Sequence, residues 1–181
     1  MAVLTKFEEK TIATEKIFEG KVINVQVDTV KLPNGNESKR ELVKHPGAVA
    51  VIAVTNDDKL VLVRQFRKPL EKTILEIPAG KIDPGEEPIK TAARELKEET
   101  GYEAAELELV TSFYTSPGFA DEIIYLYEAK GLTHGDAEPD EDEFVEIEEV
   151  TIEQARSYVA DQTIHDAKTA YAVMYLQLNQ A

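Results

Sequence analysis

Three glutamates in one short stretch have the types and spacing that could hold a metal ion. Glu95, Glu98 and Glu99 fall on one arc of a helix at about 100° per residue, apart from the arc of the neighbouring cations. Carboxylates three or four residues apart on a helix repel one another by about a few tenths of a kcal/mol per pair, and near the C-terminus they oppose the macrodipole. Hard divalent cations need several oxygen ligands, so the pattern favours a metal site whose bound water could become a nucleophile.

The helix that must carry these glutamates is predicted over residues 88–100. Pro88 suits a first helical turn, and Gly101 suits the left-handed position after the last one. An alternative is a solvent-facing helix on which Arg94 and Lys97 screen the glutamates, as is usual for an acidic triplet by itself. The face expected to pack on a sheet consists of Ile89, Ala92, Ala93 and Leu96.

A longer pattern around the helix decides against that alternative. From Gly80 the chain reads glycine, five residues, glutamate, seven residues, Arg-Glu, an aliphatic residue, any residue, Glu-Glu, any residue and glycine at Gly101. This resembles the Nudix box, the signature of hydrolases that act on nucleoside diphosphates linked to a further group. The chain departs from the pattern only at Tyr102, where an aliphatic residue is more usual.

The resemblance implies a fold, a cofactor and roles for the matched residues. Mg²⁺ is the implied cofactor, with Mn²⁺ as an alternative. Glu86 and Arg94 would be structural, the arginine tying the preceding loop to the helix through charge-assisted bonds. The implied metal ligands are the Ala79 carbonyl, Glu95, Glu99 and Glu143, with Glu98 supporting the cluster as a catalytic residue.

A second segment points to the substrate. Pro117 stands fifteen residues past Tyr102, within a Ser-Pro-Gly sequence that resembles the mark of the ADP-ribose pyrophosphatase branch. An ordinary Pro-Gly turn between two strands is the alternative. Arg40-Glu41 and Arg67 match substrate-contacting positions of that branch, although each arginine could equally be a surface residue. The implied substrate-binding residues are Lys21, Val22, Arg40, Glu41, Arg67, Lys81, Ser116, Pro117, Gly118 and Glu122.

An acidic run, residues 138–143, carries the implied general base. In the alignment that the resemblance suggests, Glu141 falls on the base and Glu143 on a further metal ligand. Asp140, Asp142 and Glu143 are neighbours of Glu141, and a slip of one residue changes the assignment. A solvated loop without a catalytic role is the alternative.

The composition restricts the partners. The formal net charge of −15 and the pI near 4.6 disfavour nucleic acid and require local cations at any phosphate-binding site. The absence of cysteine excludes disulfides, thiolate metal sites and a cysteine nucleophile. The longest apolar run, residues 48–54, is far shorter than the ~18 residues of a membrane helix. We therefore expect a cytoplasmic protein that does not bind membranes.

The remaining pattern predicts an α+β fold. Strands are expected from residue 22 onward, with a hairpin turn over residues 32–35 and a strand buried on both faces within residues 47–55. Thr151 and Gln154 have the spacing of a capping box that opens a helix, and a last helix covers about residues 166–178. The resemblance implies a mixed β-sheet sandwiched between helices and an additional N-terminal antiparallel β region.

The predicted domains and function follow. Residues 1–45 would form the N-terminal β region, and residues 46–181 the Nudix hydrolase domain. In this family the first region usually exchanges between two subunits, which implies a homodimer in which Lys21 and Val22 approach the adenine. The implied reaction is metal-dependent hydrolysis of ADP-ribose to AMP and ribose 5-phosphate. Alternatives are another ADP-sugar or nucleoside diphosphate derivative as substrate, or a non-catalytic nucleotide sensor.

Overall fold

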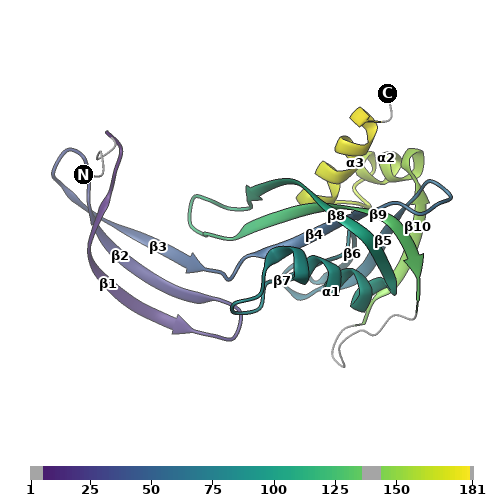
Figure 1. Cartoon of the computed structure of the whole chain (residues 1–181). Helices are drawn as coiled ribbons and strands as arrows, with labels where there is room; N and C mark the ends of the chain where they lie inside the picture. Colours follow the sequence, from purple (N-terminus) through teal and green to yellow (C-terminus); the bar gives the residue numbers. More distant parts are fainter. Residues whose placement is uncertain (1–5, 136–143, 180–181) are drawn as a thin grey trace. The chain divides into compact units, whose positions relative to one another are not determined.

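The computed structural model describes residues 6–135 and 144–179, which form two compact units. One unit contains residues 6–47 with Phe113–Ile123, and the other contains Ala48–Ser112 with the described residues from Ile124 onward. Helices and strands are labelled in Figure 1. The predicted α+β class is confirmed, with three helices, a mixed sheet and a separate N-terminal antiparallel sheet among the described residues.

The first unit is built on a three-stranded antiparallel sheet in the order β1-β2-β3 (Figure 1). The predicted hairpin turn is present: the Gly35 N–H donates to the Leu32 carbonyl at 2.9 Å, and Gly35 has a φ of 86°, which glycine adopts readily. The segment Phe113–Ile123 joins this unit because Val43 exchanges backbone hydrogen bonds with Phe119 and Asp121. The strands are β1 (Lys10–Glu19), β2 (Asn24–Lys31) and β3 (Glu37–Lys44).

Strand β1 was not predicted, and all of its residues are exposed. A strand with both faces exposed shows no apolar period in its sequence. A buried carboxylate helps to hold it: Asp28 on β2 accepts hydrogen bonds from Thr11 at 3.1 Å and Thr14 at 2.8 Å on β1, and from Gln26 at 2.9 Å. Burial by itself would raise the pKa of Asp28, but these donors, Thr14 foremost, lower it.

The second unit contains two sheets, one ordered β10-β5-β6 and the other β7-β4-β9-β8. Strand β4 is the centre of the core: it pairs parallel with β9 and antiparallel with β7, and its last five residues are buried. The prediction of a strand buried on both faces is therefore confirmed. The strands are β4 (Ala48–Ala53), β5 (Lys59–Arg67), β6 (Lys72–Glu76), β7 (Ala79–Lys81), β8 (Tyr102–Tyr114), β9 (Ile123–His134) and β10 (Glu146–Thr151).

Helices cover the strands of the second unit on two sides. Helix α1 packs on β4, β5 and β7, whereas α2 and α3 pack on each other, with α2 also against β5 and β10 (Figure 1). The predicted capping box is confirmed, since the Thr151 side chain accepts from the Gln154 N–H and the Gln154 side chain accepts from the Thr151 N–H. None of the described helices has the length and apolar character to cross a membrane. The helices are α1 (Pro88–Thr100), α2 (Ile152–Ala160), α3 (Ala167–Asn179) and the short 3₁₀ helix η1 (Lys68–Leu70).

Candidate active site

Helix α1 has the predicted bounds, but its buried face is rotated relative to the prediction. Ala92 and Leu96 pack into the core as expected, whereas Ile89 and Ala93 are exposed. In their place the helix buries Glu95 and Glu99, which are only 8% and 3% exposed. The alternative of a solvent-facing acidic helix is therefore wrong. Two carboxylates next to an apolar core carry a desolvation cost, which requires specific partners.

Glu95 lies against the backbone of β7 at the one position where the strand has no side chain. A Cβ atom built on Gly80 would lie 1.9 Å from the carboxyl carbon of Glu95 and 2.0 Å from one of its oxygens. Only glycine therefore leaves room for this carboxylate. Glu95 also accepts a hydrogen bond from the Arg94 Nη1 at 2.9 Å.

Glu99 is held by donors from two strands. The side-chain amide of Gln65 on β5 donates to Oε1 at 2.6 Å, and the backbone N–H of Ala79 on β7 donates to Oε2 at 3.0 Å. Both of its oxygens thus have a partner. These contacts fix the Glu99 carboxylate beside the first residue of β7.

Arg94 links the loop before α1 to the helix, as the sequence predicted. Its guanidinium donates to Glu86 at 3.1 Å through Nη2, and its Nη1 donates to Glu98 at 2.8 Å as well as to Glu95. These carboxylates raise the pKa of Arg94, Glu86 foremost, and Arg94 in turn lowers the pKa of Glu86. One arginine therefore offsets part of the repulsion within the glutamate face of α1, by which we mean Glu95, Glu98 and Glu99.

The glutamate face has the donor chemistry of a hard-cation site. In the part of the chain that the structure describes, no three His, Asp or Glu side chains stand arranged as a complete metal site. Mg²⁺, however, usually keeps several waters and takes one or two carboxylates together with substrate phosphates. Glu95 and Glu99 supply those two carboxylates from one rigid helix, and the absence of a side chain at Gly80 makes room for the Glu95 carboxylate itself. The residues present therefore fit such an ion.

Arg67, at the end of β5, does not lie free on the surface. Its Nε and Nη2 donate to Glu76 at 2.6 and 3.0 Å, while its side chain keeps 39% exposure. The bond to Glu76 raises the pKa of Arg67, and the charge of Glu99 raises it further. Gln65 and Arg67 are two residues apart on one strand, so they project from the same face of β5. One face of β5 thus carries both Arg67 and Gln65, the residue that contacts Glu99.

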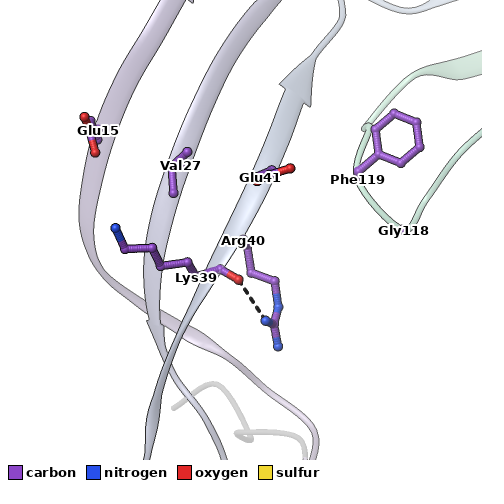
Figure 2. A pocket seen from close by; sticks show the side chains of 7 residues that line it. All are labelled: Glu15, Val27, Lys39, Arg40, Glu41, Gly118 and Phe119. Carbon is purple, nitrogen blue, oxygen red and sulfur yellow. Dashed lines mark hydrogen bonds between the residues drawn. The ribbon is translucent and has the colours of Figure 1, made fainter.

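The first unit places three other predicted residues, Arg40, Glu41 and Gly118, at a groove of about 510 Å³ (Figure 2). The cross-strand row Glu15, Val27 and Glu41 lies on the three strands in register, and Gly118 and Phe119 lie beside it. Arg40 reaches the groove, but its Nε and Nη2 are bonded to Glu9 at 2.7 and 2.6 Å. The groove is lined by Glu15, Val27, Lys39, Arg40, Glu41, Gly118 and Phe119.

The Ser-Pro-Gly segment forms a turn between β8 and β9. The Ser116 carbonyl accepts from the backbone N–H groups of Phe119 at 3.1 Å and Ala120 at 2.9 Å. Glu122 closes the turn by accepting from the Thr115 hydroxyl at 2.6 Å, and it lies 3.6 Å from the His45 ring nitrogen. The turn anticipated as the ordinary alternative is therefore present, and one of its residues, Gly118, reaches the groove.

The predicted site residues thus form two sets, one in each unit. Ala79, Lys81, Arg67 and the glutamate face belong to the second unit. Glu141 and Glu143 lie outside the described residues. The set in the first unit consists of Lys21, Val22, Arg40, Glu41, Ser116, Pro117, Gly118 and Glu122, with Lys21 and Val22 exposed between β1 and β2.

Comparison with known proteins decides the family. The model of the NUDIX domain matches residues 44–173, and that of the nucleoside diphosphate sugar hydrolase N-terminal domain matches residues 9–43. The chain belongs to the NUDIX domain family. The resemblance drawn from the Nudix box is confirmed.

Two relatives of this Nudix hydrolase match it over nearly its whole length. The methanol dehydrogenase activator of Bacillus methanolicus is 61% identical over 97% of this chain and 96% of its own. The ADP-ribose pyrophosphatase of Bacillus subtilis is 60% identical over 98% of this chain and 97% of its own. A crystal structure of an ADP compounds hydrolase, at 22% identity, covers 97% of this chain and 95% of its own with a TM-score of 0.83, which supports the Nudix fold.

The Nudix box accounts for the helix but leaves out two residues at the site. Gln65 holds Glu99 and Glu76 holds Arg67, and neither Gln65 nor Glu76 is among the predicted site residues. A signal for Gln65 was available, because it stands two residues before Arg67, the spacing of one face of a strand. Divalent-metal dependence is a general property of Nudix hydrolases, in agreement with the carboxylates at this site.

Proposed function

We propose that this Nudix hydrolase cleaves ADP-ribose to AMP and ribose 5-phosphate. The observation that carries the proposal is the pair of buried carboxylates, Glu95 and Glu99, on helix α1; Glu95 lies against Gly80 of strand β7. The 60% identity to the ADP-ribose pyrophosphatase of Bacillus subtilis supports the choice of substrate. The groove beside Arg40 and Glu41 supports a further binding surface in the first unit.

In the proposed reaction, water adds across the pyrophosphate. The attacking oxygen bonds to one phosphorus, the bridging P–O bond breaks, and the bridging oxygen leaves with the other phosphate, so one water is consumed. Glu95, Glu99 and the Ala79 carbonyl would hold Mg²⁺, or alternatively Mn²⁺, with Glu143 as a further ligand and Glu98 supporting the cluster. When bound, the ion lowers the pKa of water and offsets the charge of the diphosphate.

The other residues would bind and orient the substrate. Arg67 would hold phosphate oxygens through its planar fork, which suits them better than an ammonium group does. Glu141 would accept the proton of the attacking water. The further contacts are proposed for Lys21, Val22, Arg40, Glu41, Lys81, Ser116, Pro117, Gly118 and Glu122.

We further propose that the protein is a cytoplasmic homodimer in which residues 1–45 exchange between subunits. Strand β1 lies at an edge of its sheet, and it exposes Ile12, Ile17 and Phe18 by 47–56%. An exposed edge strand with apolar side chains is a surface that another chain can cover. Sedimentation equilibrium tests this proposal, and a monomer at micromolar concentration would contradict it.

The proposed function is tested by product analysis. With ADP-ribose and Mg²⁺ we expect AMP and ribose 5-phosphate in equal amounts, and with excess chelator we expect turnover to fall to background. Catalytic efficiencies for ADP-ribose, ADP-glucose, GDP-mannose and diadenosine polyphosphates then rank the substrates. Binding of ADP-ribose without release of AMP would indicate the sensor alternative instead. A higher efficiency for another substrate would replace ADP-ribose in the proposal.

The general base is identified by a pair of substitutions in the acidic run. Glu141→Gln is expected to lower kcat by about 10²–10⁴-fold, the usual contribution of a positioned base. Because the amide cannot accept the proton, the pH dependence of kcat should lose its acidic limb as well. Glu143→Gln is the matched comparison: a loss of that limb in Glu143→Gln alone would move the base from Glu141 to Glu143.

A further inference from the structure

A buried carboxylate forms ion pairs with Arg67 and with a second cation. The Glu76 side chain, at the end of β6, is 3% exposed and accepts both bonds of the Arg67 fork. Its Oε2 also accepts from the Nζ of Lys168, which arrives from the first turn of α3. Burial would raise the pKa of Glu76, but the two cations outweigh it and lower the pKa. The glutamate is therefore held as an anion between an arginine and a lysine.

The geometry leaves a defined edge of Arg67 unused by Glu76. A guanidinium has five N–H groups, and the contacts to Glu76 take the one on Nε and one of the two on Nη2. One hydrogen of Nη1 and the second of Nη2 point together from the end of the guanidinium, and this outer edge can hold two oxygens of one anion. The Arg67 side chain as a whole keeps 39% exposure, so the fold does not enclose it.

Lys168 is a second cation on the carboxylate that anchors Arg67, and Asp166 offsets the Lys168 charge in turn. Lys168 shares the Glu76 carboxylate and lies 3.0 Å from Asp166 as well. Asp166 accepts from the N–H and the hydroxyl of Thr169, at 3.0 and 2.7 Å, and so caps the first turn of α3.

The same turn of α3 is bonded to the end of β6. The Thr169 hydroxyl oxygen accepts from the backbone N–H of Ile77 at 2.9 Å, and both residues are buried. Lys168 therefore comes from a rigid part of the fold, one residue along from Thr169, and Glu76 directly precedes Ile77. The carboxylate and the ammonium group have little freedom to move apart.

We propose that Glu76 and Lys168 are positioning residues that hold Arg67 with its outer N–H edge toward the diphosphate of the substrate. The inference rests on the proposed function, in which Arg67 binds that diphosphate. A second argument supports it: Gln65, on the same face of β5 as Arg67, contacts Glu99 at 2.6 Å, so one strand places the arginine fork and the glutamate face together. The competing interpretation is that the buried charges only stabilise the fold.

A double-mutant cycle separates the two interpretations. Its readouts are the Kd for the analogue of ADP-ribose in which a methylene replaces the bridging oxygen, and the melting temperature. Arg67→Ala is expected to weaken binding by about 10–100-fold, as loss of charge-assisted bonds does. Glu76→Gln should weaken it by about 10-fold in the natural background and by less than about 2-fold in the Arg67→Ala background. A role in folding alone would lower the melting temperature and leave Kd unchanged in both backgrounds.

Two further variants keep the test decisive. Lys168→Met retains the aliphatic stem, and it is expected to weaken binding by about 3–10-fold only where Arg67 is present. If Glu76→Gln does not fold, the double variant Glu76→Gln/Lys168→Met takes its place in the cycle. This double variant removes both buried charges together. Glu148→Gln is the matched control. Glu148, on β10, pairs with Arg64, which is on β5 like Arg67, so the variant removes a carboxylate from a different arginine of the same strand. It should leave Kd unchanged.

The outcomes distinguish this inference from the function on which it rests. If Arg67→Ala weakens binding and Glu76→Gln weakens it equally in both backgrounds, Glu76 does not act through Arg67 and the inference is wrong. An unchanged Kd in folded Glu76→Gln overturns it as well. If Arg67→Ala itself binds the analogue normally, the role of Arg67 in the proposed function fails together with the inference.

Discussion

Glu99→Gln is expected to lower kcat for ADP-ribose by about 10²–10³-fold, the scale of losing one preorganised electrostatic contact in a transition state. The substitution keeps the size of the side chain but removes the negative charge that a divalent ion needs. It also removes one of the two oxygens that accept from Gln65 and from the Ala79 N–H. Steady-state kinetics with saturating Mg²⁺ measure the effect.

The fold should survive this substitution. Gln65 can turn its amide to present an oxygen in place of its donor, so we expect a stability change of only about 1 kcal/mol. Glu103→Gln is the matched control: it removes the same charge from an exposed residue just past α1, whose partner is Lys97. Its turnover should equal that of the unchanged protein. Near-normal turnover of a folded Glu99→Gln variant would remove Glu99 from the proposed metal ligands.

The fold was predictable wherever local signals and burial agree. The bounds of α1 follow from Pro88 and Gly101, and Gly101 does adopt the left-handed conformation with a φ of 72°. The buried strand β4 and the capping box at Thr151 were likewise read from apolar continuity and from residue spacing. Strand β1 could not be found in this way, because none of its residues is buried and its partners lie on β2.

The site was predictable by residue type and less so by environment. Helical spacing placed Glu95 and Glu99 on one arc, but it could not show that this arc turns inward. The reason is tertiary: the donors that make burial of Glu99 tolerable come from Gln65 and from the Ala79 backbone, on two other strands. The same holds for Arg67, whose partner Glu76 is nine residues away and buried.

Tyr102 shows how a departure from the family pattern is accommodated. The position is 8% exposed, as an aliphatic residue would be, yet its hydroxyl donates to Glu149 on β10 at 2.6 Å. Burial, together with Glu149, raises the pKa of Tyr102 to about 12, so the phenol stays protonated and remains a donor. The ring also meets His134 edge-on, with centroids 4.8 Å apart. The sequence could flag the departure but not this polar partner.

Gly80→Ala is expected to abolish most activity through a single methyl group. The added Cβ would lie 1.9 Å from the Glu95 carboxyl carbon, whereas unstrained contacts of this kind exceed 3.0 Å, so the carboxylate must move by more than about 1 Å. A misplacement of that size at a reacting centre can lower a rate by about 10²-fold. Since Glu95 is bonded to Arg94, moving its carboxylate also disturbs that bond. We therefore expect kcat to fall by about 10²-fold in a chain that still folds.

The control for Gly80→Ala is Gly85→Ala, in the segment between β7 and α1. Gly85 has a φ of 84° with nothing within 4 Å of an added Cβ, so Gly85→Ala strains the backbone by about 1–2 kcal/mol without touching a carboxylate. It should lower the melting temperature more than Gly80→Ala does and leave kcat within about 3-fold of the unchanged protein. Circular dichroism melting and ADP-ribose turnover, measured on both variants, separate lost stability from a displaced ligand. If Gly80→Ala turns over normally, the Glu95 carboxylate is not needed at its position beside β7, and a direct metal bond from it becomes untenable.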